Sequence, residues 1–501
     1  MGSYDYDAIV IGSGVGGLTC GALLAKRGLK TIVLENHDTI GGFCSTFEDE
    51  GFHFDTGACL VEFMQVYDTI FEALGKKKED YVDFRPCDPI YSFRTPEGEY
   101  LDIPTDIQET HDVIKQYSKK DAKNWLKYCD FWREMNEGSM EKYLQTDMQS
   151  WKSLLKMGDW KSLKFLPVYM TTYETLIKKW FSHQTTLDAF GFQSYWMGLP
   201  PKLCPGLYAG INYGEHEGIY YPMGGMISIP KALLAIGQEY GLELQLNTRV
   251  SKVIVQNGKA RGVELADGTK LSSKIVVSNV NAKTLYLDLI GEENLPRGVV
   301  KGVKSYKLSM AAPLLYLGIK GDVPLRGHHS LQLRPFQKMN EMWDELFGKK
   351  RLLDDPTCLI SWPTETDPSL APEGHHAVTV MSNGPYELEH GTWDDRREEF
   401  MDQVLGFVDK TLWPGISDQI VYKKLTTPLD FERTFLSPHG AVYALQNDIA
   451  STMIFRPANR SKSIEGLYLV GASTHPGGGV PMVASSGKLS ADLIMADSPS
   501  L

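Results

Sequence analysis

The sequence predicts an α/β fold of more than one unit, in which one unit contains a parallel sheet that binds a dinucleotide. Near the start of the chain, an apolar strand leads into a glycine-rich turn and a helix, and a second apolar strand ends in an acidic residue. Much later, two hairpin signals and further apolar strands follow. At 501 residues the chain is also too long for a single ordinary core. The intervening segments mix strands and helices and are predicted to form a second, α+β unit.

The nucleotide-binding unit is expected to start with a strand at residues 7–11, because DAIVI is nearly all apolar, as in a buried parallel strand. A G-x-G-x-x-G turn follows, then an alanine- and leucine-rich helix over residues 18–27, which Gly28 can terminate. A second strand is expected at residues 31–34. The turn consists of Gly12, Ser13, Gly14, Val15, Gly16 and Gly17.

Each part of this unit has a physical role. Gly12 permits the tight turn, Gly14 lets the backbone approach a pyrophosphate, and Gly17 lets the helix pack closely on the strand. The N-terminus of the helix then receives the phosphate charge. Glu35 follows Gly12 by 23 residues, where a carboxylate accepts hydrogen bonds from a ribose diol and would repel a 2′-phosphate. This argues against NADP.

The residues after Glu35 favour FAD over NAD. Residues 40–46 (IGGFCST) and 51–58 (GFHFDTGA) resemble the glutathione-reductase-type FAD fold and, within it, the flavin amine oxidase and phytoene desaturase superfamily. The resemblance implies that a second glycine pair lies against the nucleotide. It also implies that the stretch from Phe54 to Gly57 reaches the flavin ring.

The rest of the chain alternates between the two units. Residues 89–94 and 99–103 flank Pro-Glu-Gly and predict a hairpin, and residues 107–190 are mostly helical in character. A helix is expected from about residue 226 to Ala235, followed by a strand at residues 242–246.

A β-meander is expected next, because Asn-Gly and Asp-Gly separate runs at residues 253–255, 262–265 and Leu271. A buried strand is expected at residues 275–279. A meander placed late in a dinucleotide fold is typical of these FAD domains.

The closing segment is expected to contain a buried strand, a glycine turn and a helix from about Val483 to Met495. Before it, strands are expected at residues 312–318 and 376–381. We therefore expect an FAD-binding domain made of residues 1–75, 218–290 and 461–501. A discontinuous substrate- and membrane-facing domain is expected at residues 76–217 and 291–460.

The C-terminal LYLVGASTHPGGGVPMV, together with TPLDFE at residues 427–432 and SPHG at residues 437–440, resembles the bacterial-type phytoene desaturases, a family that includes carotenoid isomerases and retinol saturases. The resemblance spans nearly the whole chain and is weakest at residues 110–215. It implies FAD, a hydrophobic polyene or isoprenoid substrate, and a domain that takes substrate from a membrane. We expect an FAD-dependent oxidoreductase that desaturates a carotenoid precursor.

Two departures leave the direction of the chemistry open. Many family members carry Arg where this chain has Phe43, and a basic residue where it has Met223. A flavin-dependent cis-trans isomerase and a retinol-saturase-like reductase therefore remain alternatives. Two other classes share the scaffold: a flavin amine oxidase acting on a soluble amine, and a non-enzymatic lipid- and protein-binding module like the GDP-dissociation inhibitors.

The candidate polar residues near the flavin ring are Glu62, His439 and His475, although a lone histidine in a glycine loop more often makes a structural hydrogen bond. The candidate FAD-binding residues are Gly12, Ser13, Gly14, Val15, Gly16, Gly17, Glu35, Asn36, Gly41, Gly42, Phe43, Cys44, Gly57, Ala58, Val250, Gly471, Ala472, Val480, Pro481, Met482 and Val483. No metal site is expected.

Composition limits the partners. The net charge of −12 disfavours nucleic acid, and seven scattered cysteines without a CxxC pair suit a reducing compartment. No signal peptide or membrane-spanning run is expected, so we predict a cytoplasmic protein with peripheral membrane contact as an alternative. Oligomeric state cannot be predicted.

Residues 151–181 are the candidate for that membrane contact, because they combine aromatic side chains with six lysines and only two acidic residues, a local charge of +4. The lysines are Lys152, Lys156, Lys161, Lys164, Lys178 and Lys179. The alternative is an ordinary lid whose aromatic side chains belong to the core.

Overall fold

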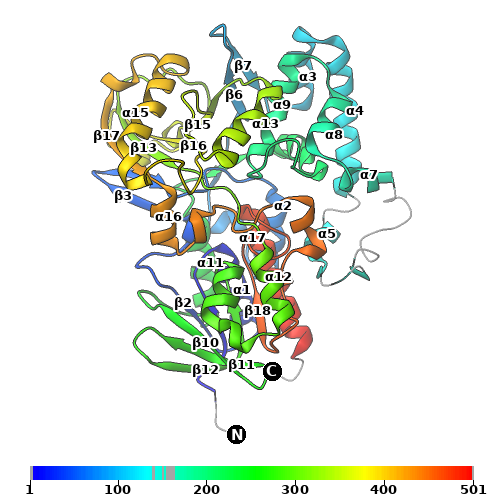
Figure 1. Ribbon diagram of the computed structural model, residues 1–501, viewed down its shortest axis with the longest axis vertical. Helices are drawn as coiled ribbons and strands as arrows, with labels where there is room; N and C mark the ends of the chain where they lie inside the picture. Colours follow the sequence, from blue (N-terminus) through cyan, green and yellow to red (C-terminus); the bar gives the residue numbers. More distant parts are fainter. Residues whose placement is uncertain (1–3, 138–140, 149, 151, 154–163, 499–501) are drawn as a thin grey trace.

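The computed structural model describes residues 4–137, 141–148, 150, 152–153 and 164–498. In this part of the chain, strands form two seven-stranded sheets and two two-stranded sheets. Figure 1 shows the two large sheets in separate lobes, one above the other, with both ends of the chain at the foot of the lower lobe. The predicted α/β class is confirmed.

The first large sheet, in the lower lobe, has the order β10-β11-β12-β1-β2-β9, and β18 pairs with β12. Pairings among β18, β12, β1, β2 and β9 are parallel, whereas β10 and β11 form antiparallel pairs. The bounds are β1 Tyr6–Ile11, β2 Thr31–Leu34, β9 Glu243–Gln245, β10 Val250–Gln256, β11 Lys259–Leu265, β12 Lys270–Ser278 and β18 Leu467–Leu469.

One sequence expectation for this sheet is wrong. The third meander strand and the buried strand at residues 275–279 are a single strand, β12. Its first half pairs with β11, where Gly262 faces Ser272, and its second half pairs with β1, where Ile9 faces Val276. A strand has two hydrogen-bonding edges, so one extended segment can join the meander to the parallel sheet.

The second large sheet, in the upper lobe, has the order β17-β13-β16-β15-β14-β6-β7. The hairpin predicted at residues 89–103 is confirmed by the antiparallel pair β6 and β7. The bounds are β6 Tyr91–Arg94, β7 Tyr100–Ile103, β13 Leu314–Lys320, β14 His329–Gln332, β15 Cys358–Ser361, β16 His375–Ser382 and β17 Ile420–Thr426. The small sheets pair β3 Thr46–Asp49 with β4 Phe52–Asp55 and β5 Phe84–Pro86 with β8 Tyr220–Pro222.

Helices cover these sheets and form most of the segment between residues 107 and 191. The α-helices are α1 Val15–Lys26, α2 Met64–Ala73, α3 Ile107–Tyr117, α4 Lys119–Met135, α5 Glu141–Gln145, α7 Leu166–Tyr169, α8 Tyr173–Trp180, α9 Gln184–Gly191, α10 Ile211–Gly214, α11 Ser228–Glu239, α12 Arg297–Ser305, α13 Met339–Trp343, α14 Pro363–Thr366, α15 Trp393–Thr411, α16 Pro428–Phe435 and α17 Val480–Asp497. Two of them begin three residues earlier than predicted, α1 at Val15 and α17 at Val480, because each starts directly after a glycine.

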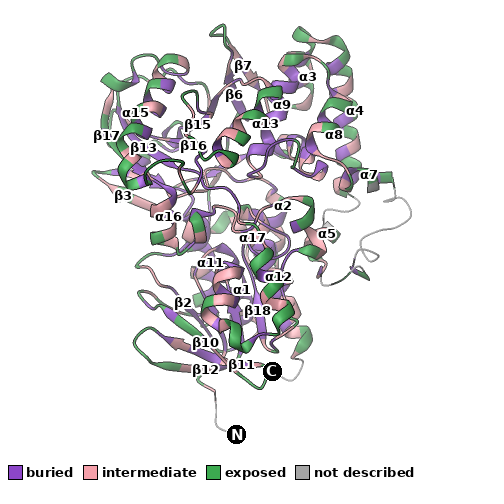
Figure 2. Ribbon diagram, viewed as in Figure 1, coloured by how far each residue is buried: buried purple, intermediate pink, exposed green. Residues whose placement is uncertain are grey.

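The central strand β1 faces a different layer on each side. Ala8 and Val10 belong to the same apolar core as α1, α11 and α17, whereas Ile9 and Ile11 pack with the meander and the segment after β12. Successive strand residues point to opposite faces, so an all-apolar strand is buried on both sides. Figure 2 shows this interior as buried between more exposed helices and turns.

Among the residues that the structure describes, no helix is both long and apolar enough to cross a membrane. The first sheet draws its strands from residues 6–34, 243–278 and 467–469, and the second from residues 91–103 and 314–426. The exact domain boundaries given above remain a prediction.

Candidate active site

The first glycine turn packs α1 directly against β1 and β2. The amide of Gly12 donates to the carbonyl of Leu34 at 2.8 Å, and Gly12 has a φ of +93°, which a side chain disfavours. A Cβ atom at Gly17 would lie 2.2 Å from the Gly12 carbonyl oxygen. No side chain caps α1, whose N-cap is Gly14, and its first turn contains no acidic residue. Its free N–H groups are therefore available to an anion.

Glu35 lies at the end of β2 and is buried. Its carboxylate accepts hydrogen bonds from the amide and hydroxyl of Ser13, at 2.8 and 2.6 Å, and from the amide of His37 at 3.0 Å. The neighbouring Asn36 is partly exposed, and Val250 is buried at the start of β10. The acid thus lies against the glycine turn, where the sequence predicted a ribose-binding group.

The second glycine pair lies against the first turn. Gly41 donates its amide to the carbonyl of Ser13 at 3.1 Å, and Gly14 and Gly41 form an isolated parallel bridge. The Phe43 carbonyl accepts from the amide of Ala58 at 3.0 Å, and a Cβ at Gly57 would lie 2.9 Å from the same carbonyl oxygen. The motifs at residues 40–46 and 51–58, which are separate in the sequence, therefore pack against each other and form one surface, the glycine wall.

Cys44 is buried behind that wall, where its thiol donates to the carbonyl of Met226 at 3.3 Å. Burial raises the pKa of this thiol, so it is a structural group rather than a reactive thiolate.

The C-terminal glycine loop completes the site. Gly471 donates its amide to the Ser486 hydroxyl at 2.7 Å, and α17 starts after Gly479 without a side-chain cap. A Cβ at Gly16 would lie 2.9 Å from both the Gly471 nitrogen and the Val483 oxygen. The starts of α1 and α17 therefore meet. Four predicted cofactor residues at this junction are partly exposed: Ala472, Val480, Met482 and Val483, whereas Pro481 is buried.

Asn279 belongs to this site and was missed by the sequence interpretation. A Cβ at Gly14 would lie 2.3 Å from its Nδ2, and a Cβ at Gly471 would lie 2.4 Å from its Oδ1. The partly exposed Asn279 side chain therefore lies between the two glycine loops. Its position directly after a buried parallel strand is the signal that could have identified it, because ligands bind outside the carboxyl ends of such strands.

Arg456 is a second residue that sequence interpretation missed. Its guanidinium is buried and donates to the Ala472 carbonyl at 2.6 Å, to Asn447 Oδ1 at 2.9 Å and to the Ser451 carbonyl at 3.2 Å. All three acceptors are neutral. Desolvation lowers the pKa of Arg456. The Arg456 side chain thereby anchors the C-terminal glycine loop through the Ala472 carbonyl.

These features together fit a flavin dinucleotide. Two uncapped helix starts provide free N–H groups for a pyrophosphate, the glycines leave backbone accessible, and Glu35 lies where a ribose diol would bind. When bound, a flavin supplies a hydride acceptor. The protein supplies its orientation and electrostatics.

His475 and His439 are in different environments. His475 is buried, its Nε2 donates to the Tyr143 carbonyl at 2.8 Å, and desolvation lowers its pKa to about 4. It is a neutral side chain with a structural hydrogen bond. His439 is exposed; its ring stacks on Tyr386 at 4.5 Å and its amide donates to Glu432. No contact joins His439 to the other candidates among the described residues.

Glu62 is partly exposed but strongly desolvated. Its exposure is intermediate, yet desolvation raises its pKa to about 7. Accessible surface combined with desolvation is expected of a side chain that lines an interior space rather than the outer surface. Tyr143, Tyr208 and Tyr443 have the same combination. Tyr443 also adjoins the closing glycine loop, because a Cβ at Gly478 would lie 2.9 Å from its ring.

The raised pKa of Glu62 predicts a pH dependence of stability. The folded protein binds a proton at Glu62 that the unfolded chain releases at its ordinary pKa of 4.5, so the contribution is complete below about pH 4.5 and is lost as pH rises through about 7. As the pH rises, we expect the free energy of unfolding of Glu62→Gln to fall by up to about 3 kcal/mol less than that of the wild type. Urea unfolding of both proteins at pH 5 and at about pH 8 measures the effect. Equal pH dependence in the two proteins would contradict it.

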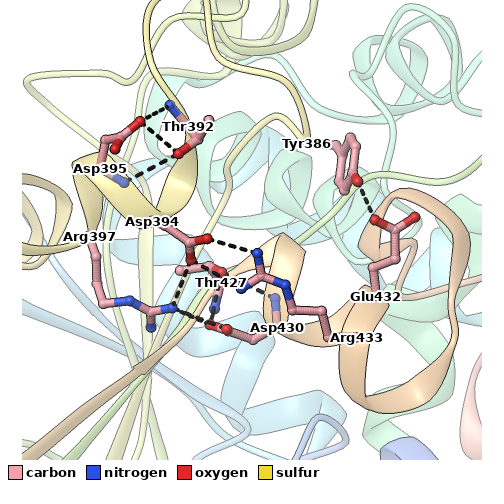
Figure 3. A network of polar contacts seen from close by, with 9 residues as sticks. All are labelled: Tyr386, Thr392, Asp394, Asp395, Arg397, Thr427, Asp430, Glu432 and Arg433. Atoms are coloured by element: carbon pink, nitrogen blue, oxygen red, sulfur yellow. Dashed lines mark hydrogen bonds and ion pairs between the residues drawn. The ribbon is translucent and has the colours of Figure 1, made fainter.

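The TPLDFE segment forms the start of α16 and joins it to α15. Thr427 and Asp430 make a capping box, and the Asp430 carboxylate also accepts from Arg397 at 2.8 Å. Arg433 donates to Asp394 of α15 at 2.7 Å. Figure 3 shows these contacts, with a second capping box at the start of α15. The segment therefore has a structural role.

Helix α16 contacts Phe43, the residue that stands where many family members carry arginine. The Phe43 ring packs against Phe435 at 4.7 Å and Phe431 at 5.5 Å. An apolar contact thus joins the second glycine loop to the upper lobe at this position.

Most described aromatic side chains of residues 151–181 belong to the core. Phe165, Tyr173 and Phe181 are buried. Lys164 pairs with Glu134, and Lys178 with Glu174. The buried aromatic side chains fit the lid interpretation, whereas the lysines lie at the surface. Trp151, Trp160, Lys156 and Lys161 lie outside the described residues.

The parallel sheet, its two uncapped helix starts and the glycine wall define a dinucleotide-binding oxidoreductase fold. The model of the family of flavin containing amine oxidoreductases matches residues 15–495. The chain belongs to this family, and it is a flavin-containing oxidoreductase.

Curated relatives match over almost the full length. The phytoene desaturase (lycopene-forming) of Pseudescherichia vulneris is 28% identical over 492 residues, covering 98% of this chain and 99% of the relative. The phytoene desaturase (neurosporene-forming) of Rhodobacter capsulatus is 30% identical over 500 residues, covering 97% of this chain and 93% of the relative.

Solved structures share the fold. An oxidoreductase from Methanosarcina mazei matches with a TM-score of 0.65 at 17% identity, covering 98% of this chain and 99% of the other. The Rab GDI of Plasmodium falciparum matches with a TM-score of 0.51 at 12% identity, covering 84% of this chain and 88% of the other. At such identities the similarity concerns the fold alone.

Proposed function

We propose that this protein is an FAD-dependent desaturase of a hydrophobic carotenoid precursor. The observation that carries the proposal is a set of side chains that are partly exposed yet strongly desolvated, Tyr143, Tyr208, Tyr443 and Glu62, of which Tyr443 adjoins the C-terminal glycine loop; we infer that they line an enclosed space. An aromatic lining suits a long apolar polyene better than a small charged amine. The full-length relatives named as phytoene desaturases support the same substrate class.

FAD is proposed over a mononucleotide because the adenosine half has its own contacts. Glu35 would accept from the ribose, and the uncapped start of α1 would hold the pyrophosphate. The backbone at Gly42 and Gly57 would lie along the flavin, and the start of α17 would face its ring. The desaturation would then use the flavin as the hydride acceptor.

The test begins with the visible absorption spectrum of the purified protein. The released cofactor is identified by chromatography as FAD or FMN. The protein is then incubated with phytoene in phosphatidylcholine liposomes, with a quinone as electron acceptor, and products are separated by chromatography. We expect more conjugated polyenes and no hydrogen peroxide release with putrescine. A colourless protein that FAD cannot reconstitute would favour a binding module. Cis-trans isomers without new double bonds would favour the isomerase, and polyenes with fewer double bonds under reducing conditions would favour the saturase.

We further propose peripheral membrane contact through residues 151–181, since a polyene substrate partitions into lipid. Met170, in this segment, is 76% exposed, and the described lysines 152, 164, 178 and 179 are exposed. Each lysine near an anionic surface contributes about 1 kcal/mol.

Replacing all six lysines of this segment by glutamate should therefore weaken binding to phosphatidylglycerol vesicles at least about tenfold, measured by co-sedimentation. The control replaces six exposed lysines elsewhere: Lys252, Lys270, Lys274, Lys301, Lys304 and Lys320. Equal weakening in both variants would show that only net charge matters, and unchanged binding would remove this segment as the contact.

A further inference from the structure

We propose that Glu62 and Glu215 form a proton-holding pair beside the enclosed space, in which Glu62 takes up the proton that the substrate loses and Glu215 acts as its positioning residue. The role of Glu62 in proton uptake rests on the proposed function. The existence of the pair does not. Neither carboxyl is needed to hold the dinucleotide by any contact described above.

The two carboxyls are brought together by neighbouring stretches of backbone. Val61 and Tyr220 exchange two backbone hydrogen bonds of 2.8 Å each. The ring of Phe63 packs on Gly214, where a Cβ would lie 2.8 Å from it. Glu62 lies between Val61 and Phe63 in one segment. Glu215 directly follows Gly214 in the other segment. The segments therefore run side by side.

Glu215 is fixed in place. It is 3% exposed, and the Tyr91 hydroxyl donates to its Oε1 at 2.6 Å, while Gln193 donates to its Oε2. Tyr91 begins β6 of the upper sheet, so this carboxyl belongs to the boundary between the sheet and the glycine wall. The Glu62 carboxyl has no hydrogen-bond partner among the described residues, which leaves its oxygens free to accept a proton.

Among the described residues, no lysine or arginine interacts with either carboxyl strongly enough to keep both ionised. Burial and the charge of Glu62 raise the pKa of Glu215 well above its ordinary value. The titratable side chains whose charges interact with one or both carboxyls are Tyr67, Tyr91, Tyr128, Tyr173 and Tyr443. Two histidines are nearby, His216 next in the chain and His329 against Tyr91 at 5.9 Å, and desolvation lowers the pKa of each to about 4. Both are neutral, so the two carboxyls resist ionising together, and Glu62, with its pKa of about 7, becomes a carboxylate as the pH rises through neutrality.

This charge state suits the chemistry of desaturation. One C–H bond of the substrate breaks with its electron pair, which leaves as hydride to the oxidised flavin. A neighbouring C–H bond loses its proton to the Glu62 carboxylate, and the electron pair left behind forms the new C=C bond. Glu62 becomes a carboxylic acid and later returns the proton to water, while an electron acceptor of the quinone class reoxidises the cofactor.

The test has two arms that use the flavin-loaded, full-length protein and the variants Glu62→Gln, Glu215→Gln and the double variant. Exposed Glu97→Gln is the matched control. The first arm needs no substrate: infrared difference spectra between about pH 5 and about pH 9 record the C=O stretch of protonated carboxyls. The second arm records the pH profile of flavin reduction by phytoene in a single turnover.

In the infrared arm, we expect a carboxyl that titrates near pH 7 in the wild type and in the Glu215→Gln and Glu97→Gln variants. Glu62→Gln should remove the titration near pH 7 and lower the pKa of Glu215, because the negative charge of Glu62 is gone, and the double variant should lack both titrations. A wild-type titration that persists in Glu62→Gln would overturn the pair.

In the reduction arm, Glu62→Gln should slow flavin reduction about 100-fold at about pH 8 and flatten the pH profile, as expected for loss of a general base. An unchanged profile would overturn the role of Glu62 in proton uptake. If the wild type itself fails to react with phytoene, the proposed function fails, while the infrared arm still decides whether the pair exists.

Discussion

Replacing Gly17 by alanine is expected to weaken flavin binding at least about tenfold and to destabilise the protein by about 1–3 kcal/mol. The added Cβ would lie 2.2 Å from the Gly12 carbonyl oxygen and 3.3 Å from the Val10 side chain. The Gly12 carbonyl belongs to a tight turn and the Val10 side chain is buried, so neither can move without strain. Helix α1 must therefore shift away from β1, which moves its free N–H groups out of position. Flavin content after purification and the midpoint of thermal unfolding measure the two effects.

Gly298→Ala is the matched control, because nothing lies within 4 Å of a Cβ at that position. Gly298 is in helix α12, where alanine is the better helix former, so this variant should be at least as stable as the wild type. Flavin binding should be unchanged. If Gly17→Ala retains full flavin content, the close packing of the first helix is not what positions the cofactor.

Arg456→Met is expected to have the second large effect, a loss of about 3–5 kcal/mol in the free energy of unfolding together with weaker flavin binding. The methionine fills much of the same space but leaves the carbonyls of Ala472 and Ser451 and the amide oxygen of Asn447 without their buried donor. Each such unsatisfied group costs about 1–3 kcal/mol. Because Ala472 is part of the closing glycine loop, the loop should loosen and release the cofactor.

Urea unfolding and titration of apoprotein with FAD measure both consequences of the Arg456 variant. Arg133→Met serves as the control, since that side chain is 45% exposed, pairs with Asp130 on the surface and lies over the Tyr213 ring. Similar losses in both variants would contradict the role assigned to Arg456. A variant that is destabilised but still binds FAD with wild-type affinity would limit Arg456 to a structural function.

The nucleotide-binding half of the fold could be predicted from sequence because its signals are local. The strand at residues 7–11, the glycines and Glu35 follow one another within thirty-five positions, and each has a conformational requirement that few other residues meet. The continuity of β12 could not be predicted in this way. Its change from antiparallel to parallel pairing depends on which strands lie on its two edges, and one of them, β1, comes from the beginning of the chain, far from β12 in sequence.

The site could be predicted only in part for the same reason. Glu62 stood out as a carboxyl near the flavin motif, but its neighbour Glu215 lies in a helical segment whose sequence gives no hint of the contact. Arg456 and Asn279 act through distances set by tertiary packing. His439 was quoted because it belongs to the SPHG segment, yet its exposed ring stacks on Tyr386. A motif identifies a segment, whereas the direction of each side chain depends on what packs around it.

The order of strands in the lower sheet has a consequence for biosynthesis. The second-last strand to be joined, β12, pairs with β1 across more than two hundred and sixty positions, and β18 and α17 are made only at the end. Contacts of such long separation close slowly. The ribosome must therefore release nearly the whole polypeptide before the cradle for the cofactor exists, and until then the edge of apolar β1 that pairs with β12 stays open and prone to aggregation. Loading of the yellow cofactor is thus a late event in maturation, and riboflavin supply should affect the yield of folded protein rather than its synthesis.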